Sequence, residues 1–376
     1  MINFNIPFTS KDAILKLNKQ SNFVSYGGNG YWTKKTQRYL ENKFKFKKVF
    51  LTNSCTSALE ISALCLKLKK SDEVIIPSYA YPTTASAFLR CGYKIRFVDS
   101  NKDNPRIDKK DFLKIVNKNT KAVVIVHQAG QLEDIDFFLK QKKKYGFKII
   151  EDAAQALNLK HKLKFAGSFG DFGCISFHES KNLHCGLGGM LIVNNKKDEK
   201  ISQIIWERGT NRSLFEEKKV SKYSWKEIGS NFYLSELQSL FLFFQLKKLK
   251  FIQKKRAYCF KIYSNIFKRK TLRSHITDMD TSISTNYHMR YILLKNKSVR
   301  EKLIKFLKKN NISSVSHYEP LHLSKVGMNL DRRKLKNAKQ FSERVLRLPI
   351  HTFLNKSDLD KVEKKLIHFF KTKISS

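Results

Sequence analysis

The sequence predicts an α/β protein with a large domain, built on a mostly parallel sheet between layers of helices, and a smaller C-terminal α/β domain. Between residues 47 and 195, short β-branched runs alternate with amphipathic segments. The runs are apolar throughout, as in strands that are buried on both faces of a parallel sheet. The pattern changes after about residue 250, so we expect the large domain over residues 1–250 and the small domain over residues 251–376.

Seven strands are expected in the large sheet, at residues 49–52, 73–76, 95–98, 122–126, 148–150, 174–177 and 189–193. Helices are expected between several of them, at residues 56–68, 83–91, 109–117 and 135–145. This alternation favours a parallel sheet, because parallel neighbours need a crossover connection. The last two strands follow each other without a helix, so we expect an antiparallel strand there.

The rest of the chain has a different pattern. Two helical segments flank a polar, irregular stretch at residues 208–230. In the small domain, residues 287–294 and 314–317 predict strands, and residues 299–310 predict a helix. Ser357 is a candidate N-cap for a terminal helix.

Composition and charge exclude several classes of protein. Hydrophobic residues make up 41% of the 376 residues, so the chain is not intrinsically disordered. The net charge of +42 favours nucleic acid as a partner, but lysines are spread over nearly every expected helix and no nucleic-acid-binding signature accompanies them. No apolar run spans a bilayer and no signal peptide is visible, so we expect a cytoplasmic protein. The six cysteines include no CxxC pair, so we expect reduced thiols and no metal site.

Two motifs carry the candidate chemistry. The first, Glu151-Asp-Ala-Ala-Gln155, directly follows a strand, where α/β sheets place ligand-binding residues. The second, Ser176-Phe-His-Glu-Ser-Lys-Asn182, precedes a glycine-rich turn. Chemistry with pyridoxal 5′-phosphate (PLP) needs an aspartate facing the pyridinium nitrogen and a lysine that forms a Schiff base. Each residue alone has an ordinary reading, because Lys181 also fits a solvated surface lysine and Asp152 a helix cap.

Together, the motifs identify a family resemblance. The sequence resembles the DegT-type sugar-nucleotide aminotransferases, which have the fold-type-I architecture of PLP enzymes. The shared pattern is Glu151-Asp-Ala-Ala-Gln155, Gly167-Ser-Phe-Gly-Asp171, Ser176-Phe-His178, Lys181-Asn182 and Gly188-Gly189, within a match from Ile6 to Pro349. Inside the family, the chain is most similar to the dTDP-4-amino-4,6-dideoxygalactose transaminases of enterobacterial common antigen synthesis. Residues 51–57, 77–79, 208–213, 222–230 and 317–322 carry that closer match.

The resemblance implies roles around the cofactor ring. Lys181 is expected to bind PLP covalently and to shuttle the proton, and Asp152 is expected to pair with the pyridine nitrogen. Gln155 is expected near the phenolic oxygen of the ring. Tyr81 matches the aromatic residue that stacks on the ring, although outside the motif it would be read as an ordinary core aromatic.

The resemblance also implies where the cofactor phosphate binds. Thr56 and Ser57 open a helix after the first strand, where free amide groups and the helix dipole favour an anion. Both residues are equally good helix caps, and capping is compatible with phosphate binding. Ser176 is expected to add a hydroxyl. Asn231 matches a position that reaches the phosphate from the partner subunit, which implies a homodimer with shared active sites.

Six further residues have two open readings each. His178, in the same motif as Lys181, either transfers protons or packs next to Lys181. Arg208 and Arg212, in the irregular stretch, either bind the diphosphate of a nucleotide sugar or are solvated cations. Three residues of the small domain match a substrate-side segment of the family, whereas a lone histidine on a strand is more often structural. The six are His178, Arg208, Arg212, His317, Tyr318 and His322.

The resemblance implies an aminotransferase that moves the amino group of L-glutamate to C4 of a dTDP-linked 4-keto-6-deoxyhexose. Two positions depart from the expected pattern, Leu187 in place of glutamate and Gln128 in place of tyrosine, and both bear on substrate specificity. Another 3- or 4-aminotransferase of the family would share every cofactor residue. The family's dehydratases carry histidine in place of Lys181. A non-catalytic basic regulator on the same scaffold is the alternative that the net charge suggests.

Overall fold

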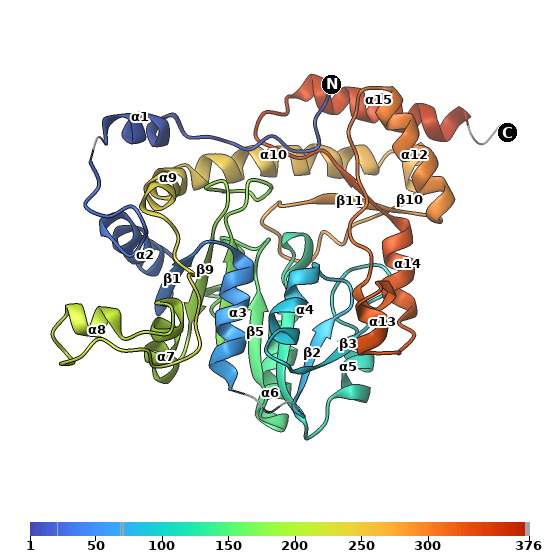
Figure 1. The fold of residues 1–376 in the computed structure, drawn as a ribbon. Helices are drawn as coiled ribbons and strands as arrows, with labels where there is room; N and C mark the ends of the chain where they lie inside the picture. The colour runs from blue at the N-terminus through green and yellow to red at the C-terminus, as the bar shows by residue number, and fades with distance from the viewer. Residues whose placement is uncertain (21, 68, 70, 373–376) are drawn as a thin grey trace.

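Two sheets of different size organise the chain. The structure, a computed structural model, describes residues 1–20, 22–67, 69 and 71–372. In Figure 1 the large sheet forms the lower part of the molecule, and the small sheet lies above it. The long helices α10 (Leu249–Phe267) and α15 (Lys356–Thr372) run across the top. One end of the large sheet therefore faces the small sheet.

Within the described residues, the large sheet has seven strands in the order β1-β9-β8-β5-β4-β2-β3. Neighbouring strands are parallel except at β9, which is antiparallel to both β1 and β8. The predicted mostly parallel sheet is confirmed, and its antiparallel strand lies where the sequence lacks an intervening helix. The strands are β1 (Lys48–Thr52), β2 (Glu73–Pro77), β3 (Lys94–Val98), β4 (Thr120–Val126), β5 (Lys148–Asp152), β8 (Phe172–Ser176) and β9 (Gly189–Val193).

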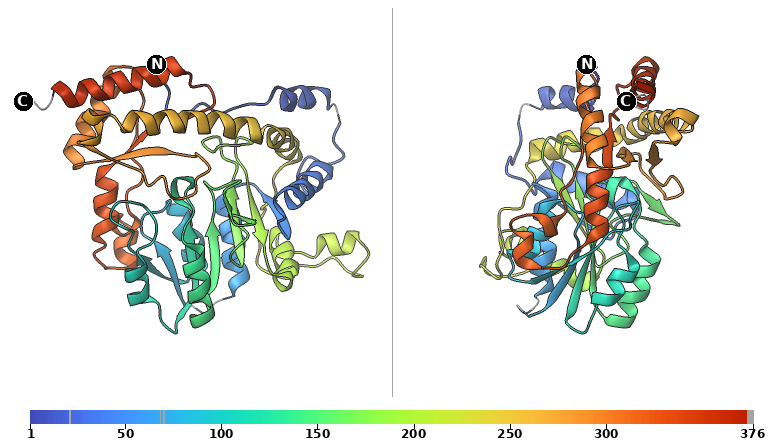
Figure 2. Two further views of the ribbon diagram at one scale, coloured as in Figure 1. Left: turned by 180° about the vertical axis from the view of Figure 1, so that it is seen from behind. Right: turned by 90° about the vertical axis from the view of Figure 1, so that its right-hand side faces the viewer.

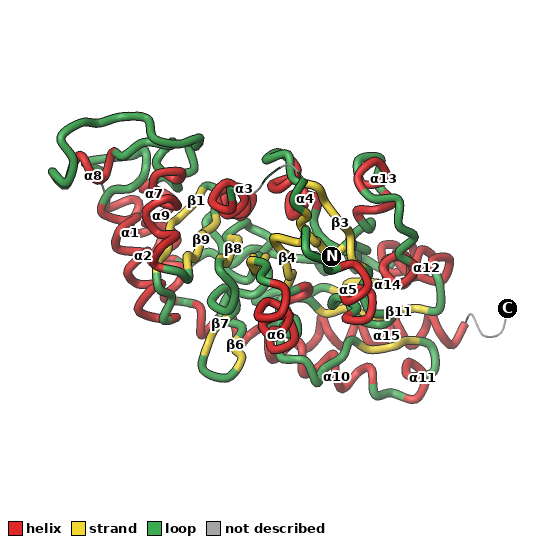
Figure 3. The backbone as a smooth tube through the Cα atoms, turned by 90° about the horizontal axis from the view of Figure 1, so that it is seen from below, coloured by secondary structure: helices red, strands yellow, loops and turns green. Residues whose placement is uncertain are grey.

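Helices cover both faces of this sheet (Figure 3). A separate hydrophobic core lies on each face of the sheet. Successive side chains of β4 point to opposite faces, so Val123 packs into one core and Val124 into the other. The expected helix at residues 56–68 begins one residue earlier, and residue 68 lies outside the described residues. The helices are α3 (Cys55–Leu66), α4 (Pro82–Leu89) and α7 (Lys196–Trp206) on one face, and α2 (Tyr31–Phe44), α5 (Lys109–Ile115) and α6 (Ile135–Tyr145) on the other.

The small sheet has three antiparallel strands within the described residues: β10 (Ile276–Asp278), β11 (Arg290–Leu294) and β12 (Val345–Leu348). The sequence predicts β11 but neither β10 nor β12, because both are too short to show a pattern. The expected strand at residues 314–317 is wrong. Only Val315 forms a bridge, to Arg347 of the four-residue strand β12.

The two ends of the chain meet the small sheet. Helix α15 begins at Lys356, and Asn355 caps it by accepting a hydrogen bond of 2.9 Å from the Asp358 amide. Ser357 therefore lies inside the first turn, and its expected capping role is wrong. Ile2 pairs with Ile312 and packs into the core of the small sheet. The domain division at residue 250 stays a prediction.

The connection between α7 and α9 (Glu236–Lys247) projects away from the sheets as an arm (Figures 1 and 2). The arm contains α8 (Arg212–Glu216) and the exposed side chain of Trp225. No helix in the described part of the chain has the length and apolar character of a membrane span. The remaining elements are α1 (Lys11–Lys19), β6 (Lys160–His161), β7 (Lys164–Phe165), α11 (Lys270–Arg273), α12 (Lys297–Lys309), α13 (Gly327–Leu330) and α14 (Lys336–Arg344).

Candidate active site

A cavity of about 720 Å³ lies between the two sheets. One wall comes from the carboxyl ends of β4, β5 and β8 and from the N-terminus of α3, and the other from residues 288–290, 317–318 and 347–350. Open α/β sheets bind ligands at the carboxyl ends of their strands, and the volume is typical of small-molecule sites. The expected site residues that line the cavity are Thr56, Tyr81, Asp152, Gln155, Ser176, His178, Lys181, His317 and Tyr318.

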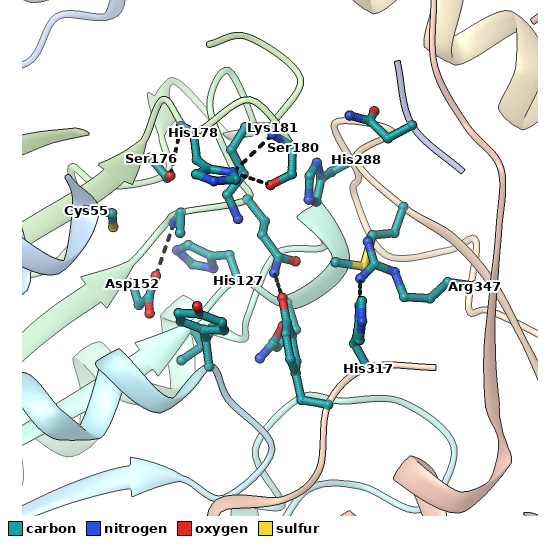
Figure 4. A pocket seen from close by; sticks show the side chains of 18 of the residues that line it. Cys55, His127, Asp152, Ser176, His178, Ser180, Lys181, His288, His317 and Arg347 are labelled. Atoms are coloured by element: carbon teal, nitrogen blue, oxygen red, sulfur yellow. Dashed lines mark hydrogen bonds between the residues drawn. The ribbon is translucent and has the colours of Figure 1, made fainter. Parts of the chain in front are cut away.

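Lys181 extends into this cavity from the connection between β8 and β9 (Figure 4). Its backbone amide donates to the carbonyl of His178 at 2.9 Å, which closes a turn. The neighbouring Asn182 donates to the carbonyl of Asn286 at 2.9 Å, and its Oδ1 lies 2.9 Å from Nδ1 of His288. Burial lowers the pKa of Lys181, so its amine is easier to deprotonate than a surface lysine.

Asp152 ends strand β5 with its carboxylate in the same cavity. Oδ2 accepts a hydrogen bond of 2.7 Å from Oγ1 of Thr84, and Oδ1 accepts one of 3.2 Å from the amide of Ala154. Burial raises the pKa of Asp152, and the hydrogen bonds from Thr84 and Ala154 oppose that rise. A buried carboxylate is costly without a cationic partner, so this arrangement favours a ligand that carries a protonated nitrogen.

The glutamate of the same motif has a structural role. Oε1 of Glu151 accepts hydrogen bonds from the amides of Phe169 and Gly170 at 2.6 and 2.7 Å. Its Oε2 accepts from the amide of Gly167 at 2.7 Å and lies 3.0 Å from Nε2 of His127. Glu151 thus anchors the loop that leads into β8, while Asp152, the next residue, faces the cavity.

The aspartate that ends this loop is also structural. Asp171 is 2% exposed and receives a hydrogen bond of 2.5 Å from the amine of Lys142 and one of 2.8 Å from the amide of Ile149. Lys148 forms a second ion pair at 3.1 Å. Burial alone would raise the pKa of Asp171, but Lys142 and the Ile149 amide outweigh it and hold that pKa below its usual value.

The N-terminus of α3 forms one end of the cavity. The Oγ of Ser54 caps the helix by accepting a hydrogen bond of 3.1 Å from the Ser57 amide, and Thr56 and Ser176 also line the cavity. The first amides of an α-helix have no partner inside the helix, so this end suits an anion. Ser57 does not line the cavity, because its hydroxyl donates to Asn53 at 2.5 Å.

Gln155 and the aromatic residues lie on the side of the cavity toward the small sheet. Oε1 of Gln155 accepts a hydrogen bond of 2.7 Å from the Ala129 amide, and its Nε2 donates to the Tyr318 hydroxyl at 3.2 Å. Tyr81 is 54% exposed, and its ring meets that of Tyr318 edge-on, with 5.7 Å between centroids. At the mouth of the cavity, Nδ1 of His178 lies 2.9 Å from the Ser180 hydroxyl.

Besides Ser57, four expected residues lie outside this cavity within one chain. Arg208 lies over the ring of Tyr233, 4.7 Å from its centroid, and Arg212 forms an ion pair of 2.7 Å with Glu216 on the arm. His322 is buried, with Nδ1 2.5 Å from the Ser78 hydroxyl. Asn231 is exposed, and its carbonyl accepts a hydrogen bond from Asn53 at 3.0 Å, close to the start of α3. Their expected roles stay predictions.

Comparison with known proteins identifies the family. The model of the DegT/DnrJ/EryC1/StrS aminotransferase family matches residues 13–367. The chain belongs to this family. A UDP-4-amino-4,6-dideoxy-N-acetyl-beta-L-altrosamine transaminase of Helicobacter pylori is 28% identical over 87% of this chain and 86% of its own length. GDP-perosamine synthase of Caulobacter vibrioides is 25% identical over 84% of each chain. The structure of H. pylori PseC, an aminotransferase of pseudoaminic acid biosynthesis, shares the fold with a TM-score of 0.90, at 24% identity and 99% coverage of both chains.

Membership of the DegT family confirms the predicted reaction class, aminotransferase, and the predicted cofactor, PLP. The described residues fit this cofactor. The carboxylate of Asp152 suits a protonated pyridine nitrogen, and the hydroxyls at the start of α3 suit a phosphate. Gly189 permits the close packing of β9 on this helix end, because a Cβ there would lie 2.4 Å from the amide nitrogen of Cys55.

The sequence reasoning missed several residues of this DegT-family site. His127 follows the carboxyl end of β4, next to Asp152, so the rule that pointed to Asp152 could also have found it. His288, Arg256 and Arg347 come from distant segments and have no local motif. Arg256 donates to the carbonyls of Tyr287 and His288 at 2.9 and 2.6 Å, and burial lowers its pKa to about 10.

Both departures from the family pattern lie on the cavity. Leu187 is 59% exposed at its edge, and its carbonyl accepts a hydrogen bond of 2.7 Å from Gln238. Gln128 is buried and donates to the carbonyl of Tyr79 at 2.8 Å. Neither contacts Asp152 or Lys181 through a hydrogen bond in the described structure, which fits an effect on the substrate rather than on the cofactor.

Proposed function

We propose that this chain transfers the amino group of L-glutamate to C4 of a nucleotide-linked 4-keto-6-deoxyhexose. The observation that carries the proposal is that Lys181 and Asp152 share one cavity with the anion-binding end of α3. PLP bound there supplies an electron sink and an aldehyde carbon for amino transfer.

In this proposal, each residue has a defined task. Asp152 holds the proton on the pyridine nitrogen, and Thr84 and the Ala154 amide keep its carboxylate in place. In the half-reaction with glutamate, the Lys181 amine, with its lowered pKa, would take the proton from the α carbon of the donor. In the separate half-reaction with the keto sugar, the same amine would deliver a proton to C4 of the sugar. Residues of the small sheet form the second wall of the cavity, and such a partly enclosed site strengthens these charge interactions.

For the sugar, we propose dTDP-4-keto-6-deoxyglucose as the first substrate to test, with dTDP-4-amino-4,6-dideoxygalactose as the product. The segments at residues 51–57, 208–213 and 317–322 support this assignment by their resemblance to dTDP-4-amino-4,6-dideoxygalactose transaminases. A second candidate is a UDP- or GDP-linked keto sugar, which the names of the Helicobacter and Caulobacter relatives favour.

The experiment is an amino-transfer assay with purified protein, PLP and glutamate across dTDP-, UDP- and GDP-linked 4-keto-6-deoxyhexoses. Formation of 2-oxoglutarate together with a 4-amino sugar, identified by NMR, is the expected result. The configuration at C4 separates a galacto from a gluco product. A protein that converts none of the keto sugars, while a known sugar aminotransferase converts them under the same conditions, contradicts the proposed substrate class.

We further propose a homodimer whose two active sites are shared. Asn231 supports this proposal, because it is exposed beside the anion-binding end of α3 and makes no side-chain hydrogen bond in the described structure. Exposed aromatic and aliphatic residues on the neighbouring arm, such as Trp225 and Ile228, provide apolar area for a second copy.

A further inference from the structure

Arg347 brings a second positive charge to the cavity, away from the phosphate end. It lies on β12 of the small sheet, and its side chain lines the cavity. In Figure 4, Ser176 and Cys55 lie on one side of Lys181, and Arg347 lies on the other. Lys181 lines the same cavity, and its pKa is lowered by burial and, to a smaller extent, by the charge of Arg347.

The guanidinium of Arg347 has no anionic partner among the described residues. One of its terminal nitrogens donates a hydrogen bond of 2.9 Å to Nδ1 of His317, and its Nε is buried without a partner. The ring of Phe4 lies beneath it, with 4.9 Å from the guanidinium carbon to the ring centroid. Burial lowers the pKa of Arg347. Arg347 is partly buried, and a partly buried charge without an anionic partner is unfavourable, so an anionic ligand at this position would be favoured.

The other charges of the cavity are already engaged. Asp152 is the sole carboxylate among the described lining residues, and Thr84 and Ala154 hold it. Arg290 forms an ion pair of 2.6 Å with Asp278, and Arg256 is hydrogen-bonded to backbone carbonyls. Arg290 also has two nitrogens without a partner, but it is fully buried and its charge is paired with Asp278. Among the described lining arginines, Arg347 is therefore the one whose charge has neither a carboxylate nor a backbone carbonyl as a partner.

His317 holds the guanidinium in place. Because Arg347 donates to Nδ1, this nitrogen must be unprotonated, and His317 is neutral. Burial and the charge of Arg347 both lower the pKa of His317, which keeps it neutral at physiological pH. His317 is thus a positioning residue for Arg347 rather than a proton donor.

We infer that Arg347 binds the α-carboxylate of the amino donor. This inference rests on the proposed function, because it assumes that an amino acid reacts at Lys181. The α-carboxylate is attached to the same carbon as the reacting amino group, so it must lie close to Lys181. The diphosphate of a nucleotide sugar is separated from C4 by the pyranose ring, and the cofactor phosphate belongs at the opposite end of the cavity. A guanidinium also matches a carboxylate by two parallel hydrogen bonds.

The test separates the two half-reactions of the PLP-loaded enzyme. Arg347→Met keeps the apolar stem and removes the charge. It should raise the glutamate concentration for half-maximal rate of the first half-reaction by at least about thirtyfold, because a buried charge pair is lost. The second half-reaction with a keto sugar should change by less than about threefold, since that substrate has no carboxylate. For Arg347→Lys, the glutamate concentration for half-maximal rate should lie between those of the wild type and of Arg347→Met. Lysine keeps the positive charge but lacks the planar guanidinium that forms two parallel hydrogen bonds.

A binding measurement supplies a readout that does not depend on turnover. Glutarate is titrated calorimetrically into the loaded enzyme, and Arg347→Met should weaken its binding at least about tenfold. Arg269→Met, which removes an exposed arginine paired with Glu363, is the matched control and should leave both half-reactions unchanged. Unchanged glutarate binding, or an equal loss in both half-reactions, overturns the inference.

A failure of the inference about Arg347 can be distinguished from a failure of the proposed substrate class. If the wild-type enzyme reacts with glutamate but aminates no keto sugar, the proposed substrate class fails. The reverse half-reaction with 2-oxoglutarate then replaces the sugar arm, and Arg347→Met should impair it as strongly as the glutamate reaction. If 2-oxoglutarate and glutamate react with the variant as with the wild type, Arg347 does not bind the donor.

Discussion

Thr84 Oγ1 donates a hydrogen bond of 2.7 Å to Oδ2 of Asp152, so a residue at the start of α4 holds the carboxylate at the end of β5. The Ala154 amide holds the other oxygen at 3.2 Å. The two donors fix the orientation of the carboxylate and favour its ionised form, whereas burial has the larger effect and raises the pKa of Asp152. In the role proposed for Asp152, these contacts would orient its carboxylate for a protonated ring nitrogen.

Replacing Asp152 with asparagine should lower kcat at least about a hundredfold, because the ring nitrogen loses the charge that keeps it protonated. The fold should persist, since the asparagine oxygen can accept the hydrogen bond from the Ala154 amide and its NH2 group can donate to the Thr84 hydroxyl oxygen. Thr84→Val should lower kcat by about tenfold, as it removes one of two donors. Steady-state kinetics and circular dichroism check both variants. An Asp152→Asn enzyme with full activity would show that this carboxylate does not pair with the ring.

Lys181 should be the attachment point of the cofactor. Purified protein should absorb near the boundary of the visible and ultraviolet regions, and borohydride reduction should leave a pyridoxyl group on the peptide that contains Lys181, as detected by mass spectrometry. Lys181→Ala should lose this absorption band and its turnover. Lys162→Ala, which removes an exposed lysine paired with Asp136, is the control and should keep both. Labelling at another lysine would contradict the assignment.

Asp171 should make stability depend on pH in the acid range. Its pKa is lowered in the folded protein, so the stabilisation is present above the unfolded value of about 3.9 and is lost as pH falls through the folded pKa. Asp171→Asn should therefore reduce the free energy of unfolding by about 1–3 kcal/mol at pH 7, and the difference should shrink toward pH 3. Urea unfolding at several pH values measures this. The exposed Asp136→Asn should have little effect, and a pH-independent loss in Asp171→Asn would refute the electrostatic explanation.

A shared active site should permit complementation between two inactive variants. Lys181→Ala and Asn231→Ala, unfolded together and refolded as a mixture, should recover about a quarter of the wild-type activity, because half of the dimers are mixed and each has one intact site. Each variant treated alone is the control. If Asn231 acts within its own chain, the mixture should be no more active than the sum of its components.

The sequence predicted most strands of the large sheet but few of the residues that form the second wall of the cavity. The strands of the large sheet are continuous apolar runs, so β4 and β5 lie within two residues of the expected bounds. Asp152 and Lys181 belong to short local motifs, which can be recognised from a single segment of the sequence. Thr84 lies 68 positions from its partner Asp152, so no spacing rule could pair them.

The small sheet explains the rest of what was missed. Arg347 lies on β12, a strand of four residues that ends before a proline, and nothing in its local pattern marks it as part of a site. Its partner His317 lies in a segment that was expected to form a strand and forms one bridge instead. Such contacts depend on how segments distant in the sequence pack together, which the periodicity of a single segment does not encode.

The first residues of the chain give the enzyme an unexpected vulnerability. Phe4 lies under the guanidinium of Arg347, and Asn5 lines the same cavity. Proteolytic removal of Phe4, or a purification handle fused just before it, should weaken the donor binding proposed for Arg347, although Phe4 and Lys181 are more than 170 positions apart in the sequence. Loss of glutamate affinity with normal cofactor absorbance would be the sign of such damage, and a handle on the other terminus would avoid it.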